Sequence, residues 1–147
     1  MATPERDGWL LEIDGRARGN PCPAGAGAVV YDPAGTRVAA RAFPLGRMTN
    51  NAAEYEGLVR GLAMARELGA ARLMVRSDSE LLVRQLNGEY RIKAPHLIDL
   101  AAKARVLAAG FTAVTFAAVP RERNVEADRL ANRAMDDVER GVIPKED

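Results

Sequence analysis

Three strand-like patterns joined by short turns open this chain, and their order limits the folds it can adopt. Residues 9–14 alternate apolar and polar side chains, residues 26–31 form a second apolar run, and residues 37–43 form a third. We expect the glycine- and proline-rich segment 15–25 to be a loop and residues 32–35, Asp-Pro-Ala-Gly, to be a hairpin turn. Strands that follow one another this closely pair antiparallel. The first third of the chain therefore predicts a three-stranded antiparallel meander.

The rest of the chain alternates helical and strand patterns. We expect helices over residues 52–68, 95–109 and 125–140, a short helix ending at residue 86, and strands over residues 71–76 and 112–119. Two capping boxes are predicted at helix starts, Asn51 with Glu54 and Ser77 with Glu80, and Asn124 is expected to cap the last helix. The order β-β-β-α-β-α-α-β-α predicts an α/β fold, with a five-stranded mixed sheet flanked by helices and its first three strands antiparallel.

Length and composition are those of one globular domain. The 147 residues are 48% hydrophobic and 28% charged, which predicts a single domain over 1–147, with a core of about 8–140 and a short tail at 141–147. No apolar run is long enough to span a membrane and no secretory signal opens the chain, so we expect a cytoplasmic monomer without a membrane partner. Cys22 is the only cysteine, which excludes an internal disulfide and a cysteine-based zinc site. The net charge of +1 means that any polyanion would have to be held by a local patch.

Four carboxylates lie where predicted elements begin or end. Asp14 ends the first strand, Glu54 opens the first long helix, Asp78 ends the fourth strand, and Asp128 lies near the start of the last helix. Any one of them alone is more commonly structural, in a turn, in a capping box or beside a helix dipole. Together at one end of a sheet they would repel one another strongly unless cations neutralised them. Oxygen ligands suit Mg²⁺ or Mn²⁺, and two such ions about 4 Å apart can support cleavage of a phosphodiester.

Four motifs carry a resemblance to a known family. They are Asp14-Gly15 with Gly19-Asn20-Pro21, Thr49-Asn50-Asn51-Ala52-Ala53-Glu54, Ser77-Asp78-Ser79, and Asn124-Val125-Glu126-Ala127-Asp128-Arg129-Leu130-Ala131. In this order and spacing, over about residues 11–136, the chain resembles ribonuclease H type 1. The resemblance implies a ribonuclease H-like fold and internal cleavage of the RNA strand of RNA/DNA hybrids, leaving 5′-phosphate and 3′-hydroxyl ends. It also implies that Asp14, Glu54, Asp78 and Asp128 bind two Mg²⁺, with Mn²⁺ able to substitute.

The same resemblance implies a set of substrate contacts. Asn20, Asn50 and Asn51 would lie along the minor groove, where amide groups can hydrogen-bond the 2′-hydroxyls that distinguish RNA from DNA. Arg47 and Thr49 match the family's pocket for a phosphate of the DNA strand, and a guanidinium and a hydroxyl suit that ligand. Without the motif, a surface arginine and a helix cap would be the more common explanations of these two residues.

The loop before the last acid departs from the pattern of many family members. Those members carry a histidine there that is thought to help product release, whereas residues 119–124 read Val-Pro-Arg-Glu-Arg-Asn. The chain resembles the shorter, archaeal-type branch, in which an arginine occupies this loop. We expect that arginine to be Arg121 rather than Arg123. An arginine does not exchange protons near neutral pH, so its role would be electrostatic.

Two further departures concern substrate binding and the loops. The basic helical protrusion of some members has no room in residues 88–95, which supply only Arg91 and Lys93, so we expect weak and salt-sensitive hybrid binding. Cys22 stands where the family usually has glycine, and a positive φ there would be unfavourable. Ala94 stands where an asparagine often supports the phosphate pocket. None of these changes alters a predicted metal ligand.

Two other functions fit parts of the sequence. One is a catalytically weak module that binds RNA/DNA hybrids or double-stranded RNA with the same fold, although the presence of all four acids argues against it. The other is a nuclease domain of a longer protein, since the family also occurs fused to other enzymes. Transposases and resolvases share the fold, but the Thr-Asn-Asn and Asn-x-x-Ala-Asp motifs disfavour them.

Overall fold

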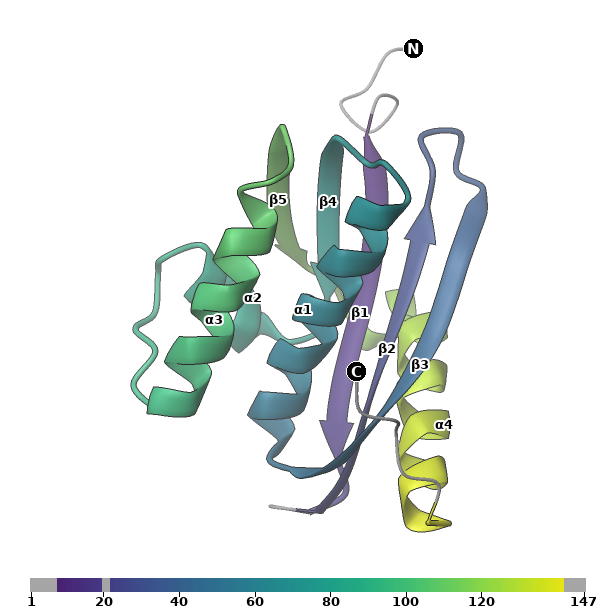
Figure 1. Cartoon of the computed structure of the whole chain (residues 1–147), viewed down its shortest axis with the longest axis vertical. Helices are drawn as coiled ribbons and strands as arrows, with labels where there is room; N and C mark the ends of the chain where they lie inside the picture. Colours follow the sequence, from purple (N-terminus) through teal and green to yellow (C-terminus); the bar gives the residue numbers. More distant parts are fainter. Residues whose placement is uncertain (1–7, 20–21, 142–147) are drawn as a thin grey trace.

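The strand β1 (Trp9–Ala17) lies at the centre of the sheet. The computed structural model describes residues 8–19 and 22–141, and its five strands pair in the order β3-β2-β1-β4-β5 (Figure 1). The other strands are β2 (Cys22–Tyr31), β3 (Arg37–Met48), β4 (Arg72–Ser77) and β5 (Ala113–Ala118). The first three strands are antiparallel, and β4 and β5 run parallel to β1. The predicted α/β class and five-stranded mixed sheet are confirmed.

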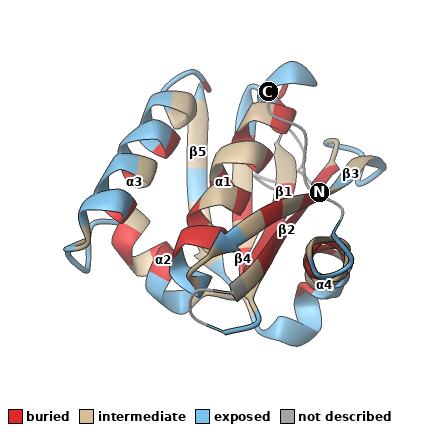
Figure 2. Ribbon diagram, turned by 60° about the horizontal axis from the view of Figure 1, so that its bottom comes forward, coloured by how far each residue is buried: buried red, intermediate tan, exposed pale blue. Residues whose placement is uncertain are grey.

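Helices cover both faces of this sheet. They are α1 (Asn50–Glu67), α2 (Glu80–Leu86), α3 (Pro95–Ala108) and α4 (Val125–Glu139), with a short 3-10 helix, η2 (Arg121–Arg123), before α4. One face is covered by α1, with α3 beside it, and the other by α4 (Figures 1 and 2). Buried residues are concentrated where these layers meet (Figure 2). Within residues 8–19 and 22–141, no helix combines the length and hydrophobicity that a membrane crossing requires.

Alternation along β2 lets two helices pack on the same strand. Ala26 lies against Gly57 of α1. Its neighbours Gly25 and Gly27 face α4, where a Cβ on residue 27 would lie 2.4 Å from the carbonyl oxygen of Ala127. Successive side chains of a strand point to opposite faces of its sheet. Small residues on the second face therefore allow α4, which carries the last of the four acids, to lie directly against the sheet.

The pairing of β1 with β4 sets the position of two of the acids. The strands are parallel, with Ile13 opposite Ser77. Asp14 and Asp78 are the next residues along the two chains, so they lie at the same level of the sheet. In open sheets of this kind, ligands bind beyond the carboxyl ends of parallel strands.

The predicted loop over residues 15–25 is wrong for most of its length. β1 continues to Ala17 and β2 begins at Cys22, with Ala17 paired to Ala24. The antiparallel ladder continues through these glycine- and proline-rich residues, because pairing with a neighbouring strand outweighs their weak intrinsic preference. Cys22 lies opposite Met48, and every described residue with a positive φ is a glycine.

Both predicted capping boxes are also wrong. Thr49 is the N-cap of α1, and its Oγ1 accepts a hydrogen bond from the amide of Ala52 at 3.1 Å. Ser79 is the N-cap of α2, and its Oγ accepts from the amide of Leu82 at 3.2 Å. The second box fails because β4 extends through its first residue. Glu54 consequently lies in the second turn of α1, where it does not take part in a capping box.

Candidate active site

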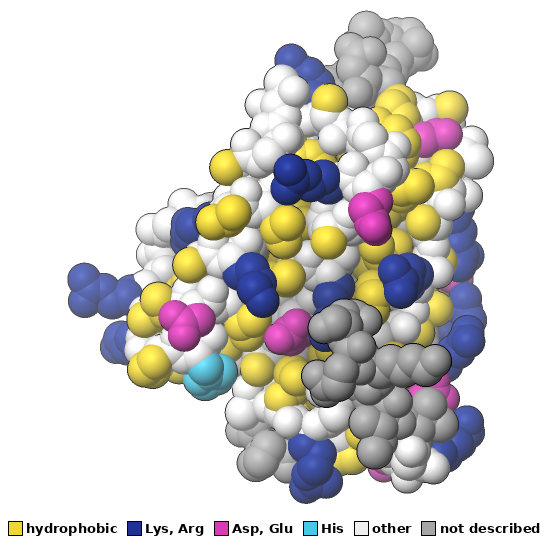
Figure 3. All heavy atoms as spheres, in the orientation of Figure 1, with side chains coloured by type: hydrophobic (Ala, Val, Ile, Leu, Met, Phe, Trp, Pro, Cys, Tyr) yellow, Lys and Arg dark blue, Asp and Glu magenta, His cyan; other side chains and the backbone are white. Residues whose placement is uncertain are grey.

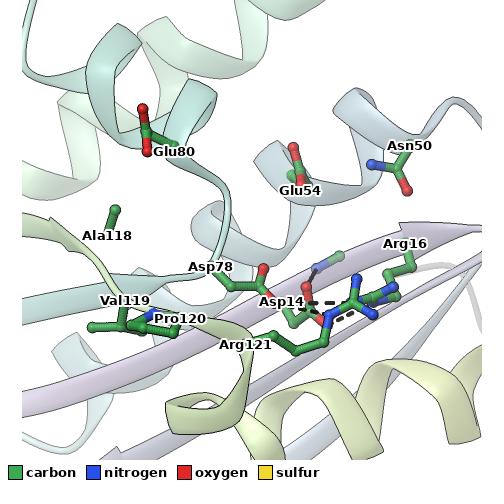
Figure 4. Close-up of a pocket in the computed structure, with 11 residues that line it drawn as sticks. Asp14, Arg16, Asn50, Glu54, Asp78, Glu80, Ala118, Val119, Pro120 and Arg121 are labelled. Carbon is green, nitrogen blue, oxygen red and sulfur yellow. Dashed lines mark hydrogen bonds and ion pairs between the residues drawn. The ribbon is translucent and has the colours of Figure 1, made fainter.

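A cleft of about 520 Å³ opens at the level where β4 ends beside β1 (Figure 4). Three of the predicted acids line it: Asp14 from β1, Glu54 from α1 and Asp78 after β4. The fourth, Asp128, lies in the first turn of α4 and is joined to this group by an ion pair with Arg16. The remaining lining residues are Gly15, Arg16, Asn50, Glu80, Ala118, Val119, Pro120 and Arg121.

Asp14 is almost fully enclosed, with 4% of its surface exposed. Its Oδ1 accepts a hydrogen bond from the amide of Gly15 at 3.0 Å, and its Oδ2 accepts one from Nε of Arg16 at 3.1 Å. Glycine follows Asp14 because β1 and α1 nearly touch: a Cβ on residue 15 would lie 2.1 Å from the carbonyl oxygen of Ala53. This close approach brings Glu54, the next residue of α1, beside Asp14 and Gly15, which lie within β1 and not at its predicted end.

Ser79 holds the side chain of Glu54. The Ser79 hydroxyl donates to Glu54 Oε1 at 3.1 Å and also caps α2, so one residue links the acid to the start of that helix. Burial raises the pKa of Glu54 to about 7; the Ser79 hydrogen bond opposes this shift, and the charge of Asp78 adds to it. Glu54 therefore gains little from ionising near neutral pH unless a cation lies close to it.

Asp78 and Asp128 each have a buried oxygen that accepts no hydrogen bond from the described residues. These atoms are Asp78 Oδ2 and Asp128 Oδ1. The other oxygen of Asp128 accepts from Nδ2 of Asn132 at 3.4 Å, one turn along α4. Buried carboxylate oxygens normally accept hydrogen bonds or face a cation. In place of hydrogen bonds, both oxygens face arginine side chains at ion-pair distance.

Arg16, which was not among the predicted site residues, contacts three of the acids. Its Nε lies 3.1 Å from Asp14 Oδ2 and its Nη2 lies 3.8 Å from Asp78 Oδ2 (Figure 4). The same Nε lies 2.8 Å from Asp128 Oδ1. Residues two apart in a strand share a face of the sheet. A β1 prediction that extended to residue 17 would have placed Arg16 on the same face as Asp14.

Arg16 does not fully compensate the negative charge around Asp14. The pKa of Asp14 is raised to about 8, mainly by burial. The charge of Asp78 adds to the rise, and the charge of Arg16 opposes it. Arg121 is a second cation near these acids, with its Nε 3.7 Å from Asp78 Oδ2. The site as a whole therefore favours further positive charge.

The residues present fit a hard divalent cation, although they are not yet arranged around one. Among the described residues, no three acidic, histidine or cysteine side chains are grouped closely enough to hold an ion as they stand. The donors are carboxylate oxygens, two of them without hydrogen bonds, and this is the chemistry that Mg²⁺ and Mn²⁺ prefer. The guanidinium of Arg16 lies among three of these carboxylates.

The predicted substrate residues are distributed around the start of α1. Asn50 lines the cleft, and its Oδ1 accepts a hydrogen bond from the amide of Ala17 at 3.2 Å. The others lie nearby in sequence but outside the cleft lining: Arg47 is exposed in β3, Thr49 is the half-buried N-cap, and Asn51 is exposed in the first turn. Asn20 lies outside the described residues.

Arg121 and Arg123 differ in their relation to the cleft. Both are exposed in η2, but Arg121 is a lining residue and Arg123 is not. Other basic side chains are dispersed over the face that carries α1 and α3 (Figure 3). Residues 87–94, between α2 and α3, contain no helix, and Arg91 and Lys93 are exposed there.

Known proteins share this sequence and fold over most of its length. The family described as reverse transcriptase-like matches residues 12–134. The chain is 48% identical over 128 residues to the bifunctional protein Rv2228c of Mycobacterium tuberculosis, covering 86% of this chain and 35% of that protein. It is 40% identical over 138 residues to ribonuclease HI of Halobacterium salinarum, covering 93% of this chain and 69% of that protein.

Solved structures of two relatives superpose closely. The N-terminal RNase H domain of Rv2228c, solved as a fusion with maltose binding protein, has a TM-score of 0.87 and 46% identity, over 90% of this chain and 96% of that one. LC11-RNase H1 in complex with an RNA/DNA hybrid has a TM-score of 0.84 and 38% identity, over 89% of this chain and 99% of that one.

These matches differ in how much of the relative they cover. The chain spans about a third of the length of the mycobacterial proteins and about two thirds of the archaeal enzyme. The family match, over residues 12–134, spans Asp14, Glu54, Asp78 and Asp128. With this extent of similarity in sequence and fold, the chain belongs to the ribonuclease H type 1 family.

Proposed function

We propose that this chain is a ribonuclease H that cuts the RNA strand of RNA/DNA hybrids internally, leaving 5′-phosphate and 3′-hydroxyl ends. The observation that carries the proposal is the meeting of Asp14, Glu54 and Asp78 in one cleft, with Asp128 joined to them through Arg16. The chain's membership of the ribonuclease H type 1 family supports the same reaction. We further propose that residues 1–147 form a single domain that acts as a monomer.

The four acids would hold two Mg²⁺, or Mn²⁺ in its place. Held there, divalent ions would supply Lewis acidity for hydrolysis of the phosphodiester. The protein's part is to position the ligands. Asp14 and Asp78 are fixed by adjacent parallel strands, Ser79 orients Glu54, and Asn132 orients Asp128.

Arg121 would contribute charge rather than proton transfer. It lies at the rim of the cleft with 63% of its side chain exposed, near Asp78. A permanently charged guanidinium there would attract the phosphate backbone and would not act as an acid or base near neutral pH. Its expected role is therefore electrostatic support of substrate binding or product release.

The hybrid would be recognised beside the cleft. The structure of LC11-RNase H1 contains an RNA/DNA hybrid, which supports that substrate class for a chain of such similar fold. We assign Asn20, Asn50 and Asn51 to minor-groove contacts with 2′-hydroxyls. We assign Arg47 and Thr49 to a phosphate of the DNA strand. We expect weak and salt-sensitive hybrid binding, because the affinity would rest on few phosphate contacts.

Cleavage of an end-labelled RNA/DNA hybrid tests the proposal. The reaction is run with Mg²⁺, with Mn²⁺ and with EDTA, beside single-stranded RNA, duplex RNA and duplex DNA. Metal-dependent cutting of the RNA strand of the hybrid is expected, with a loss of roughly 100-fold or more in Asp78→Asn because a ligand is removed. Asp99→Asn, which makes the same change on the exposed side of α3, is the control and should retain activity.

The same assay separates the enzyme from a binding module. Hybrid binding without cleavage in either metal would replace the proposed activity with a binding function. Substantial activity in Asp78→Asn would refute the assignment of that carboxylate. Circular dichroism of both variants would show whether any loss reflects unfolding.

A further inference from the structure

A single guanidinium, that of Arg16, lies against three of the four acids. Its Nε lies between Asp14 and Asp128, at 3.1 and 2.8 Å from their nearest oxygens, and its Nη2 is 3.8 Å from Asp78. These acids come from β1, from the loop after β4 and from α4, so a single side chain joins three separate elements. Arg16 is also partly enclosed, with 22% of its side chain exposed.

The guanidinium of Arg16 lies among the carboxylates where a bound metal ion would be expected. Two of the three oxygens that it faces, Asp78 Oδ2 and Asp128 Oδ1, are buried and accept no hydrogen bond from the described residues. Their attraction to Arg16 is therefore mainly Coulombic. Arg18, just after β1, is different: it pairs with Asp136 and Glu139 of α4 and is not a lining residue of the cleft.

We propose that Arg16 is an internal counter-ion that holds the place of divalent metal in the metal-free protein and competes with it. This inference rests on the proposed function, because it takes the same carboxylates as metal ligands. The guanidinium keeps Asp14, Asp78 and Asp128 together before metal is bound. To expose their oxygens it must swing out of the cleft, and its position near the end of β1 allows the long side chain to reach solvent.

Two opposing effects follow from this role. Replacing Arg16 with a neutral side chain removes a positive charge about 3–4 Å from the ligands, so divalent metal should bind more tightly. The same replacement leaves Asp14 and Asp128 without the cation that pairs with them, while Asp78 keeps Arg121, so the metal-free protein should be less stable. A residue with only a structural role would lower stability without tightening metal binding.

Metal binding by the full chain, measured by calorimetry without nucleic acid, tests the inference. The proteins are the wild type, Arg16→Gln, Arg16→Lys and Arg18→Gln, each titrated with Mn²⁺ and with Mg²⁺. We expect the dissociation constant to fall by about tenfold or more in Arg16→Gln, in keeping with charges this close. Arg16→Lys, which keeps the charge, should lie nearer the wild type, and Arg18→Gln should stay within about twofold of it.

Thermal unfolding supplies an independent readout. In EDTA, Arg16→Gln should unfold at a lower temperature than the wild type, and saturating Mn²⁺ should reduce or reverse that difference. If Arg16→Gln does not fold, the wild type still tests the idea: the Arg16 Nε–H signal in NMR, identified by its absence from Arg16→Lys, should shift when Mg²⁺ is added.

The possible failures are distinguishable. Unchanged or weaker metal binding in Arg16→Gln, with binding intact in the wild type, overturns the inference and leaves the proposed ribonuclease untouched. An unchanged Arg16 signal on saturation with Mg²⁺ overturns it as well. Absence of binding in all four proteins overturns the inference together with the metal assignment of the proposed function.

Discussion

Asn124 donates a hydrogen bond from its side-chain Nδ2 to the backbone oxygen of Ile13, at 2.8 Å. Asn124 is fully buried and is the residue before α4, and Ile13 precedes Asp14 in β1. The bond therefore joins the helix that carries Asp128 to the strand that carries Asp14. Asn124 holds the N-cap position of α4, as predicted, but its side chain makes no capping hydrogen bond.

Asn124→Ala should lower the free energy of unfolding by about 1–3 kcal/mol, because it removes a buried hydrogen bond and leaves a small cavity. Urea unfolding followed by circular dichroism measures the change. Asn87→Ala alters an exposed asparagine after α2 and is the matched control, with a change expected within about 0.5 kcal/mol. Equal effects of the two substitutions would contradict a special role for Asn124.

Gly15→Ala should destabilise the protein by about 1–3 kcal/mol or more and reduce metal binding. The added Cβ would lie 2.1 Å from the carbonyl oxygen of Ala53, and backbone at that distance cannot be relieved by a side-chain rotation. The added Cβ would push β1 and α1 apart, and this would increase the distance between Asp14 and Glu54. Gly110→Ala, where the nearest atom is 3.3 Å away, should have a smaller effect in the same denaturation and calorimetry experiments.

Thr49→Ala should lower stability by about 1 kcal/mol through loss of the α1 cap. Thr49→Ser retains the hydroxyl and should restore most of it. Hybrid affinity, measured by fluorescence anisotropy at two salt concentrations, tests the additional phosphate contact. If Thr49 only caps the helix, Thr49→Ala will change stability and leave hybrid affinity where it was.

The metal-free protein should become less stable as the pH rises from about 4 to about 8. The pKa values of Asp14 and Glu54 are raised to about 8 and about 7, so between these limits the folded chain keeps protons that the unfolded chain has released. Each group can contribute a slope of up to about 1.4 kcal/mol per pH unit. Urea unfolding in EDTA across this range measures the slope.

Asp14→Asn is the variant for this pH experiment. The amide is close to isosteric and does not ionise, so the decline should become shallower and the variant should exceed the wild type in stability at about pH 8. Asp99→Asn, at an exposed carboxylate on α3, is the control and should follow the wild-type slope. Parallel curves for wild type and Asp14→Asn would contradict the assignment of the slope to Asp14.

The element order was predictable because it depends on local patterns. Alternation along β1, the hairpin turn at residues 32–35 and the helical spacing of α1 all act within a few residues. The end of β1 and the start of β2 could not be predicted in this way. Their glycine and proline residues locally favour a loop, and the strands extend through them only because β1 and β2 pair with each other.

Some residues of the candidate site could be predicted from the sequence and others could not. Asp14 and Asp78 could be placed at one sheet edge from the topology alone. Arg16 could not be placed there because its strand was predicted to stop too early. Ser79 also escaped prediction, since its bond to Glu54 depends on how α1 and α2 lie relative to each other. Ser77 instead accepts a hydrogen bond from the amide of Ser79.

The reach of Arg16 from β1 to α4 has a consequence for synthesis. A chain that leaves the ribosome does so from its N-terminus, so Asp14, Glu54 and Asp78 emerge well before Asp128. Until α4 emerges, one face of β1, β2 and β3 lacks its helix and the cleft lacks its fourth acid. We therefore expect the nascent chain to lack the complete group of four acids until its last helix has emerged.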